Sequence, residues 1–355
     1  MGLSMGIVGL PNVGKSTLFN ALLKKQIADA SNYPFCTIAP NRGIVEVPDE
    51  RLKILAEMIN VEKIIPAAVE FVDIAGLVRG ASKGEGLGNQ FLANIREVNA
   101  ICHVVRLFED KSVAHTEADL NPEMDAELIN TELIMADLQT LEKKQAPKGR
   151  ISKEDIIMWE TVCILKAELE KGTLAIDIDL KEEQKTEAKK LCLLTAKPII
   201  YVANIGEDQL SNKDNLAGGL NLKPLIILCA KLESELAVLS SEDQEEYLRQ
   251  YGLEEPGLNR LIKTAYSTLG LISFLTTGEK ETRAWTIEKG MKAREAAGVI
   301  HSDFVKNFIK AAVISYEDYV RIGGWTEAKS QGKVRFEGAD YIMKEGDVVE
   351  FMVRQ

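Results

Sequence analysis

The chain has 355 residues, of which 46% are hydrophobic and 27% are charged, and its formal net charge is −11. This length allows two or three domains with a sizeable core, and the composition is ordinary for a soluble globular protein. The net acidity excludes a protein that coats nucleic acid with its whole surface, so any RNA contact must be local. The longest apolar runs are too short to cross a bilayer, and no basic region precedes the first one. We therefore expect an untargeted, cytoplasmic protein with no membrane partner.

The cysteines exclude two further classes of protein. They are odd in number, widely scattered and without a C-x-x-C pair, so neither a disulfide framework nor a zinc site is indicated. Their positions are Cys36, Cys102, Cys163, Cys192 and Cys229. This usage fits a reducing cytosol.

Residues 9–17 fulfil the phosphate-binding pattern G-x-x-x-x-G-K-[ST]. An apolar run before them predicts a buried strand, and the stretch from Leu18 predicts a helix. The two glycines let successive N–H groups point at phosphate oxygens, and the helix N-terminus adds its partial positive charge. Lys15 supplies a charge for the outer phosphates, and the Ser16 hydroxyl suits Mg²⁺. The residues expected to cradle a triphosphate are Asn12, Val13, Gly14, Lys15, Ser16 and Thr17.

Two later elements extend the predicted phosphate site. Asp73 begins a D-x-x-G element that ends at Gly76. In P-loop GTPases such an aspartate holds Mg²⁺ through water, and the glycine N–H senses the γ-phosphate. Thr37 lies between the first helix and the next strand, where its hydroxyl can complete the Mg²⁺ shell. The glycines that follow Asp73 indicate a switch segment with a freely rotating backbone.

The group that positions the attacking water is left open by the sequence. Leu77 stands where many such enzymes place a glutamine that orients this water. His115 is the candidate replacement, and the alternative is an exposed loop histidine. His103 lies inside an apolar run and is predicted to be structural. Asn12 is a candidate for holding K⁺ against the phosphates, although asparagine also suits tight loops.

The predicted base-binding segment departs from the guanine-specific N-K-x-D pattern. It begins with Asn204, and Ile205 replaces the lysine. The acid is either the longer Glu207 or is displaced to Asp208. Adenine presents an acceptor at N1 that a carboxylate would repel, so a site that does not aim this carboxylate loses its selectivity for guanine. Ala230 matches the base-contacting S-A-K element, with cysteine in place of serine.

The order of predicted elements indicates an α/β fold with a parallel sheet flanked by helices. Long helical periodicity with a break at residues 146–149 predicts a helical hairpin inserted into this domain. Basic residues near its turn are either a solvated tip or a contact for RNA phosphate. A small α+β domain follows, with a helix expected at residues 301–309. The predicted domains are residues 1–124 and 195–270 for nucleotide binding, 125–194 for the hairpin and 271–355 for the C-terminal domain.

These motifs together resemble the YchF family, the Obg-related branch of the P-loop GTPases that departs toward ATP use. The resemblance covers essentially the whole chain, including residues 80–91, 283–286 and 297–304. It implies a P-loop NTPase domain, an inserted helical hairpin and a C-terminal β-grasp domain of the TGS type. It also implies Mg²⁺ as cofactor and favours His115 as the water-positioning group.

The resulting prediction is a slow ATPase that forms ADP and phosphate and binds ribosomes as a nucleotide-dependent switch. Lys15 and His115 are the catalytic candidates, and Ser16, Thr37 and Asp73 are the candidate metal ligands. Gly76, Asn204, Ile205, Glu207 and Ala230 are expected to contact the nucleotide. We expect weaker GTP binding with residual GTPase activity, contact with the large subunit or whole ribosome through the TGS domain and hairpin, and a monomer.

Two alternatives remain at this point. One is a guanine-specific translational GTPase of the Obg type. The other is a scaffold that binds nucleotide without hydrolysing it and thereby orders its surfaces for RNA or protein.

Overall fold

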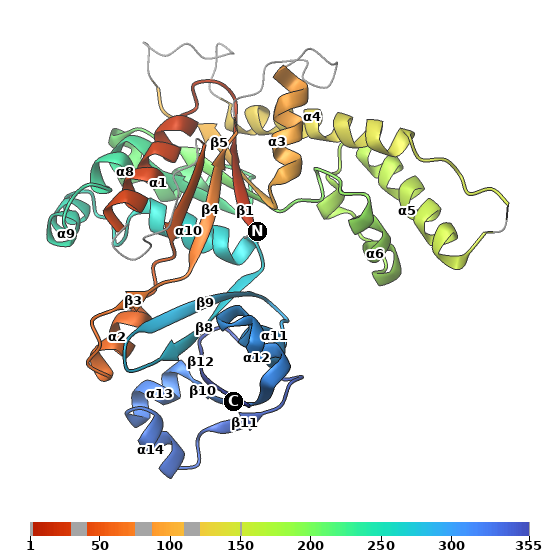
Figure 1. Cartoon of the computed structure of the whole chain (residues 1–355). Helices are drawn as coiled ribbons and strands as arrows, with labels where there is room; N and C mark the ends of the chain where they lie inside the picture. The colour runs from red at the N-terminus through yellow and green to blue at the C-terminus, as the bar shows by residue number, and fades with distance from the viewer. Residues whose placement is uncertain (1–2, 30–40, 75–86, 110–120, 150, 355) are drawn as a thin grey trace. The chain divides into compact units, whose positions relative to one another are not determined.

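The computed structural model describes residues 3–29, 41–74, 87–109, 121–149 and 151–354 (Figure 1). They form two compact units. The first comprises Met1–Lys25, Ile38–Gly43 and Glu70–Arg260, and the second comprises Gln26–Thr37, Ile44–Val69 and Leu261–Gln355. Within the described ranges, the helices are too short or too polar to span a membrane.

A six-stranded sheet organises the first unit, with strand order β2-β4-β1-β5-β6-β7. Its strands are β1 (Ser4–Val8), β2 (Arg42–Glu46), β4 (Ala68–Asp73), β5 (Ala100–Arg106), β6 (Ile199–Asn204) and β7 (Leu225–Leu228). β1 pairs in parallel with β4 and β5, and the pairs β5–β6 and β6–β7 are parallel as well. Every residue of β1, β5 and β6 is buried, as expected for central strands covered on both faces. The predicted α/β class is confirmed.

Helices connect these strands or follow the last of them, and the carboxyl ends of the parallel strands meet at one edge of the sheet. They are α1 (Lys15–Asp29), α3 (Leu87–Glu97), η4 (Glu207–Asn212), α7 (Lys213–Gly218), α8 (Ala230–Leu236), α9 (Ser241–Gln250) and α10 (Gly257–Thr268). This edge is where open α/β sheets bind their ligands. The phosphate-binding loop follows β1 there, and the predicted base-binding segments follow β6 and β7.

Three helices form the insertion between β5 and β6: α4 (Pro122–Glu142), α5 (Lys153–Leu169) and α6 (Glu182–Lys190), with η3 (Ala175–Asp177) between the last two. The Asn121 side chain caps α4, and Ser152 with Asp155 forms a capping box at the start of α5. These caps start helices on both sides of the break that the sequence indicates. Figure 1 shows α5 and α6 projecting away from the sheet.

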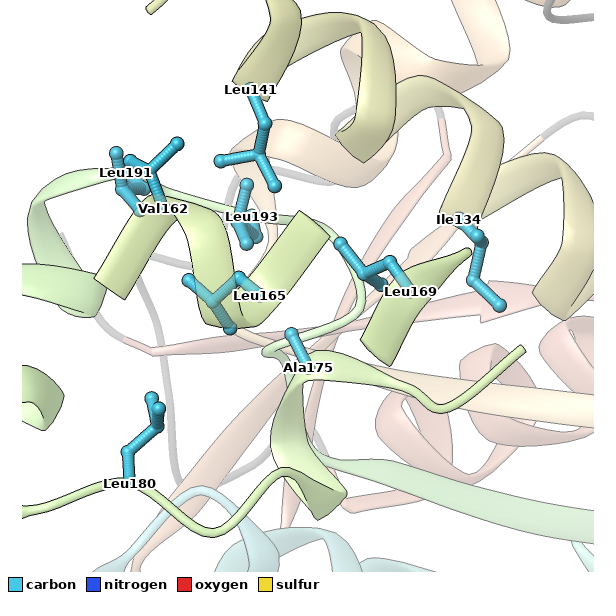
Figure 2. Close-up of a cluster of buried hydrophobic side chains, with 9 residues drawn as sticks. All are labelled: Ile134, Leu141, Val162, Leu165, Leu169, Ala175, Leu180, Leu191 and Leu193. Carbon is cyan, nitrogen blue, oxygen red and sulfur yellow. The ribbon is translucent and has the colours of Figure 1, made fainter. Parts of the chain in front are cut away.

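The insertion has its own hydrophobic core. Its buried side chains come from α4, α5 and the segments around α6, and Figure 2 labels the residues of this cluster. They are Ile134, Leu141, Val162, Leu165, Leu169, Ala175, Leu180, Leu191 and Leu193. Leu141, Leu165 and Leu169 are each only 1% exposed. Burial on this scale stabilises the hairpin beyond what helix propensity supplies.

Asp137 joins this insertion to the segment that leads into β6. Its side chain is fully buried on α4 and accepts hydrogen bonds from the backbone N–H groups of Leu194 and Thr195, both at 2.8 Å. The Thr195 hydroxyl donates a third bond at 2.7 Å. Burial raises the pKa of Asp137, and these bonds oppose that shift.

The second unit contains another six-stranded sheet, with strand order β11-β10-β12-β8-β9-β3. Its strands are β3 (Ile64–Ile65), β8 (Leu271–Thr277), β9 (Thr282–Glu288), β10 (Phe308–Ser315), β11 (Arg335–Glu337) and β12 (Asp347–Val353). Its helices are α2 (Glu50–Met58), α11 (Ala293–Ile300), α12 (Ser302–Asn307), α13 (Tyr316–Ile322) and α14 (Trp325–Ser330). The fully buried Ala293 and Ala296 of α11 pack against Phe274 and Ile287, which cover one face of the sheet.

Two features of this unit differ from the sequence predictions. The helix expected at residues 301–309 ends at Asn307, because Phe308 and Ile309 enter β10, in which Phe308 pairs with Val353 of β12. Residues 64–65, which the prediction gave to the nucleotide-binding domain, form β3 and pair in parallel with Thr282 and Arg283. An edge strand of two residues has no periodicity that would reveal this pairing.

Replacing Asp137 with Asn tests the junction. The amide NH₂ group of Asn would face a backbone N–H donor, so at least one buried hydrogen bond is lost. We expect the free energy of unfolding to fall by about 1–3 kcal/mol in urea titrations. Asp177→Asn, at an exposed position, is the matched control. Equal stability of the two variants would contradict the structural role of Asp137.

Candidate nucleotide-binding site

The loop from Gly9 to Gly14 leads from β1 into α1. Asn12 and Gly14 have positive φ angles of 63° and 98°, which turn the backbone as a phosphate-binding loop requires. A Cβ atom on Gly14 would overlap the side-chain amide nitrogen of Asn204. The Leu18 N–H donates to the Gly14 carbonyl at 2.9 Å and so begins the hydrogen bonding of α1. Glycine is therefore required at position 14 both by φ and by space.

Lys15 begins α1 with an inward-facing side chain that is 8% exposed. Its ammonium group donates to the Leu10 carbonyl at 2.7 Å, across the phosphate-binding loop. Burial lowers the pKa of Lys15, and the charge of Asp73 opposes this shift. Ser16 and Thr17 follow it with exposed side chains. The cation thus lies inside the loop, and the two hydroxyl residues remain accessible.

Asp73 is the last residue of β4, whose neighbour β1 carries the phosphate-binding loop. Its Oδ1 atom is buried and has no hydrogen-bond partner among the described residues. Burial raises the pKa of Asp73, while the Lys15 ammonium lowers it. The fold therefore brings together a lysine and an aspartate that lie far apart in the sequence. A buried carboxylate oxygen without a donor fits a site for a cation or its water shell.

Asn204, at the end of β6, connects the phosphate-binding loop with the predicted base-binding segment at the start of α8. Its Nδ2 atom donates to the Val13 carbonyl at 3.0 Å, and its Oδ1 atom accepts from the Ala230 N–H at 2.9 Å. The residue is 5% exposed, so both bonds are shielded from water. One side chain therefore ties the phosphate-binding loop to the N-terminus of α8.

The neighbouring candidates for contact with the base differ in how much of their side chains is accessible and in their partners. Ile205 is 2% exposed and its N–H donates to the Leu228 carbonyl, so little of its side chain remains for contact with a base. Glu207 begins η4, and its carboxylate forms an ion pair with the Lys231 ammonium at 2.9 Å. Asp208 lies beside the Gly206 backbone. Of the two acids that the sequence left open, Glu207 is the one paired across to α8.

His103 lies in β5 between β1 and β6 and is 1% exposed. Its ring lies 5.4 Å from that of Tyr201, centroid to centroid. Neither ring nitrogen has a hydrogen-bond partner among the described residues. Burial, together with the charge of Lys15, lowers the pKa of His103 to about 3. The imidazole is thus neutral at physiological pH and packs as a core side chain.

Several predicted site residues lie outside the described parts of the chain: Thr37, Gly76, Leu77 and His115. Sequence reasoning missed the two-sided bonding of Asn204 and the partner of Glu207. The sequence shows Lys231 directly after Ala230 in the C-A-K motif, but it does not show that Lys231 forms an ion pair with Glu207. Within the described residues, no group of three His, Cys, Asp or Glu side chains could hold a metal ion.

Comparison with known proteins identifies the family. The chain is 50% identical over 364 residues to the protein named "Ribosome-binding ATPase YchF" from Bacillus subtilis, with 99% of each chain covered. The chain belongs to the YchF family. The Mycoplasma genitalium and Escherichia coli O157:H7 proteins of the same name are 49% and 48% identical, over 98% and 99% of each chain.

Domain models and a solved structure agree with this membership. Residues 4–137 match the family described as "50S ribosome-binding GTPase". Residues 271–354 match the C-terminal YchF model, described as "Protein of unknown function (DUF933)". The solved "Structure of the Schizosaccharomyces pombe YchF GTPase" superposes with a TM-score of 0.87 at 35% identity, covering 99% of this chain and 97% of that one. The YchF names and titles thus mention both ATPase and GTPase.

Replacing Asn204 with Ala tests the connection between the two loops of this YchF site. The change removes both hydrogen bonds and leaves the buried Val13 carbonyl and Ala230 N–H without their partner. We expect a loss of about 2–4 kcal/mol in the free energy of unfolding. Urea titration measures it, with Asn215→Ala, an exposed asparagine bonded to Asn212, as control. A loss no larger than that of the control would refute the connection.

The buried His103 predicts a pH dependence of stability. In the unfolded chain a histidine binds a proton below about pH 6.5, whereas folded His103 stays neutral down to about pH 3. The unfolded state therefore binds more protons in this window, and stability falls as the pH falls, by at most about 1.4 kcal/mol per pH unit. His103→Leu should remove this contribution. Unfolding in urea at several values between pH 7 and 4.5 should give a shallower decline for this variant than for the native chain.

Proposed function

We propose that this chain hydrolyses ATP to ADP and phosphate and binds ribosomes in a nucleotide-dependent way. The observation that carries the hydrolase assignment is the buried Lys15 ammonium inside a phosphate-binding loop, beside the half-buried carboxylate of Asp73 with its partnerless Oδ1 atom. This arrangement suits a triphosphate with a bound cation. The relatives from B. subtilis and E. coli, named as ribosome-binding ATPases, support the choice of nucleotide and partner.

Mg²⁺ is the cofactor that these residues fit. The partnerless Oδ1 of Asp73 and the accessible residue Ser16 supply the oxygen groups that this ion prefers. Thr37, outside the described residues, would complete the set. When bound, Mg²⁺ would neutralise charge on the terminal phosphates. K⁺ beside Asn12, which has a left-handed backbone, is the second proposed ion.

Hydrolysis depends on positioning and electrostatic stabilisation in this proposal. Lys15 donates to the Leu10 carbonyl, and phosphate oxygens of a bound nucleotide would replace that carbonyl as its acceptor. The backbone N–H groups of residues 12–17 would cradle the phosphates. His115 is the proposed water-positioning group, since Leu77 carries no polar atom in its side chain. Both residues lie outside the described ranges.

The base-binding residues favour ATP over GTP. A guanine site aims an aspartate carboxylate at the donors of the guanine edge, whereas this chain has Glu207 three residues after Asn204 and pairs it with Lys231. A carboxylate turned away from the base gives up the interaction on which guanine selectivity depends. GTP should therefore bind more weakly and be hydrolysed only as a residual activity.

The ribosome is the proposed macromolecular partner, as the large subunit or the whole particle. The C-terminal TGS-type unit and the helical hairpin are the proposed contact surfaces, and the protein would act as a cytoplasmic monomer. ATP-dependent co-sedimentation of the intact chain with washed ribosomes, compared with ADP and with no nucleotide, tests this partner. Equal pelleting under all three conditions would contradict nucleotide-dependent binding.

Lys15→Ala tests the hydrolase assignment. Removing the ammonium group should lower the ATP turnover number by about two to three orders of magnitude, because the lysine stabilises the charge that develops on the phosphates. Lys53→Ala, at an exposed position of α2, is the control. Urea unfolding of both variants verifies that they are folded. Normal turnover by folded Lys15→Ala would refute the assignment.

Two measurements separate the alternatives. Competition between ATP and GTP for the native chain distinguishes an ATPase from an Obg-type GTPase. Single-turnover hydrolysis with and without ribosomes distinguishes both from a scaffold, which would release no phosphate under either condition.

A further inference from the structure

Two non-covalent contacts join the end of β6 and the segment after it to the start of α8. The first is the buried hydrogen bond from the Ala230 N–H to Asn204, at 2.9 Å. The second is the ion pair between Glu207 and Lys231, also at 2.9 Å. We propose that Lys231 is a specificity-determining residue, which sets the purine preference by holding the Glu207 carboxylate away from the base. This inference rests on the proposed nucleotide site and names the group that weakens its selectivity for guanine.

The chemistry of the two purines explains why the state of Glu207 matters. Guanine offers N–H donors at N1 and at its 2-amino group, and these bind a carboxylate well. Adenine has an acceptor at N1, which a carboxylate repels. An unpaired acid in this segment therefore favours guanine, and an acid neutralised by an ammonium group does not. The preference depends on what else the carboxylate of Glu207 binds.

The surroundings of Lys231 favour this pairing. Its side chain is 74% exposed and that of Glu207 is 33% exposed, so the ion pair lies near the surface, with the lysine more exposed than the acid. The hydrogen bond and charge of Glu207 raise the pKa of Lys231, and the more distant Glu235 adds to the shift. Tyr247 donates to Glu235 at 3.4 Å. Glu207 is thus the acid that contacts the Lys231 ammonium group, and Glu235 adds negative charge on the same helix.

Asn204 does not account for the difference between the purines. The guanine-specific N-K-x-D pattern carries the same asparagine, and here its amide is occupied by Val13 and Ala230. Ile205 is buried and presents no polar side-chain atom. Among the described side chains of this segment, Glu207 and Asp208 carry the charge that can discriminate, and Glu207 is the one bound to Lys231.

The test is a double-mutant cycle on the full chain: the native protein, Lys231→Met, Glu207→Gln and the double variant. Competition binding with Mg²⁺ gives the ratio of GTP affinity to ATP affinity for each. An exposed ion pair contributes only modestly to binding, so Lys231→Met should raise this ratio by up to about fivefold. In the Glu207→Gln background, the same lysine change should leave the ratio within about twofold.

Lys171→Met is the matched control, because Lys171 is 66% exposed and pairs with Glu168 at 2.8 Å on the hairpin. It should leave the ratio unchanged. An unchanged ratio in Lys231→Met would overturn the inference, as would an equal rise in the Glu207→Gln background, since the lysine would then act independently of the acid. Failure of the proposed function would give a different result. In that case the native chain would bind neither ATP nor GTP, or it would bind ATP without hydrolysing it.

Discussion

The side-chain amide of Asn204 is the constraint on which the nucleotide site depends. It holds the phosphate-binding loop through the Val13 carbonyl and the start of α8 through the Ala230 N–H. Both bonds are buried, so water cannot replace them at low cost. The same amide occupies the space that a Cβ of residue 14 would need. The glycine of the loop and the asparagine of a distant strand are therefore required together.

Charge is distributed around this connection in two different ways. On the phosphate side, Lys15 is buried and Asp73 is half-buried. Burial lowers the pKa of Lys15 and raises the pKa of Asp73, and the charge of each partner opposes the shift of the other. On the base side, Glu207 and Lys231 are nearer to solvent and form an exposed ion pair. The first arrangement suits tight binding of a polyanion with a cation. The second is the pair that we propose to adjust the base preference, and an exposed ion pair can do so only modestly.

Much of the fold could be predicted, because its signals are local. Apolar runs indicated the central strands β1, β5 and β6, and the helical periodicity on both sides of the break at residues 146–149 indicated the hairpin. The phosphate-loop residues could be identified for the same reason, since their spacing carries the chemistry. Prediction failed at Phe308, where an apolar stretch compatible with a helix joins β10. Short apolar segments do not distinguish helix from strand without their neighbours.

The sequence by itself determined the residue types of the site: a phosphate-binding loop with its lysine, an acid in D-x-x-G, and a base segment without the guanine pattern. Only the tertiary structure decided which of these groups meet. It placed Asp73 beside Lys15, Asn204 between two loops, Asp137 against the segment before β6, and Lys231 on Glu207. The physical reason is that these partners are separated in sequence, and their contacts depend on strand order and register, which local patterns do not encode.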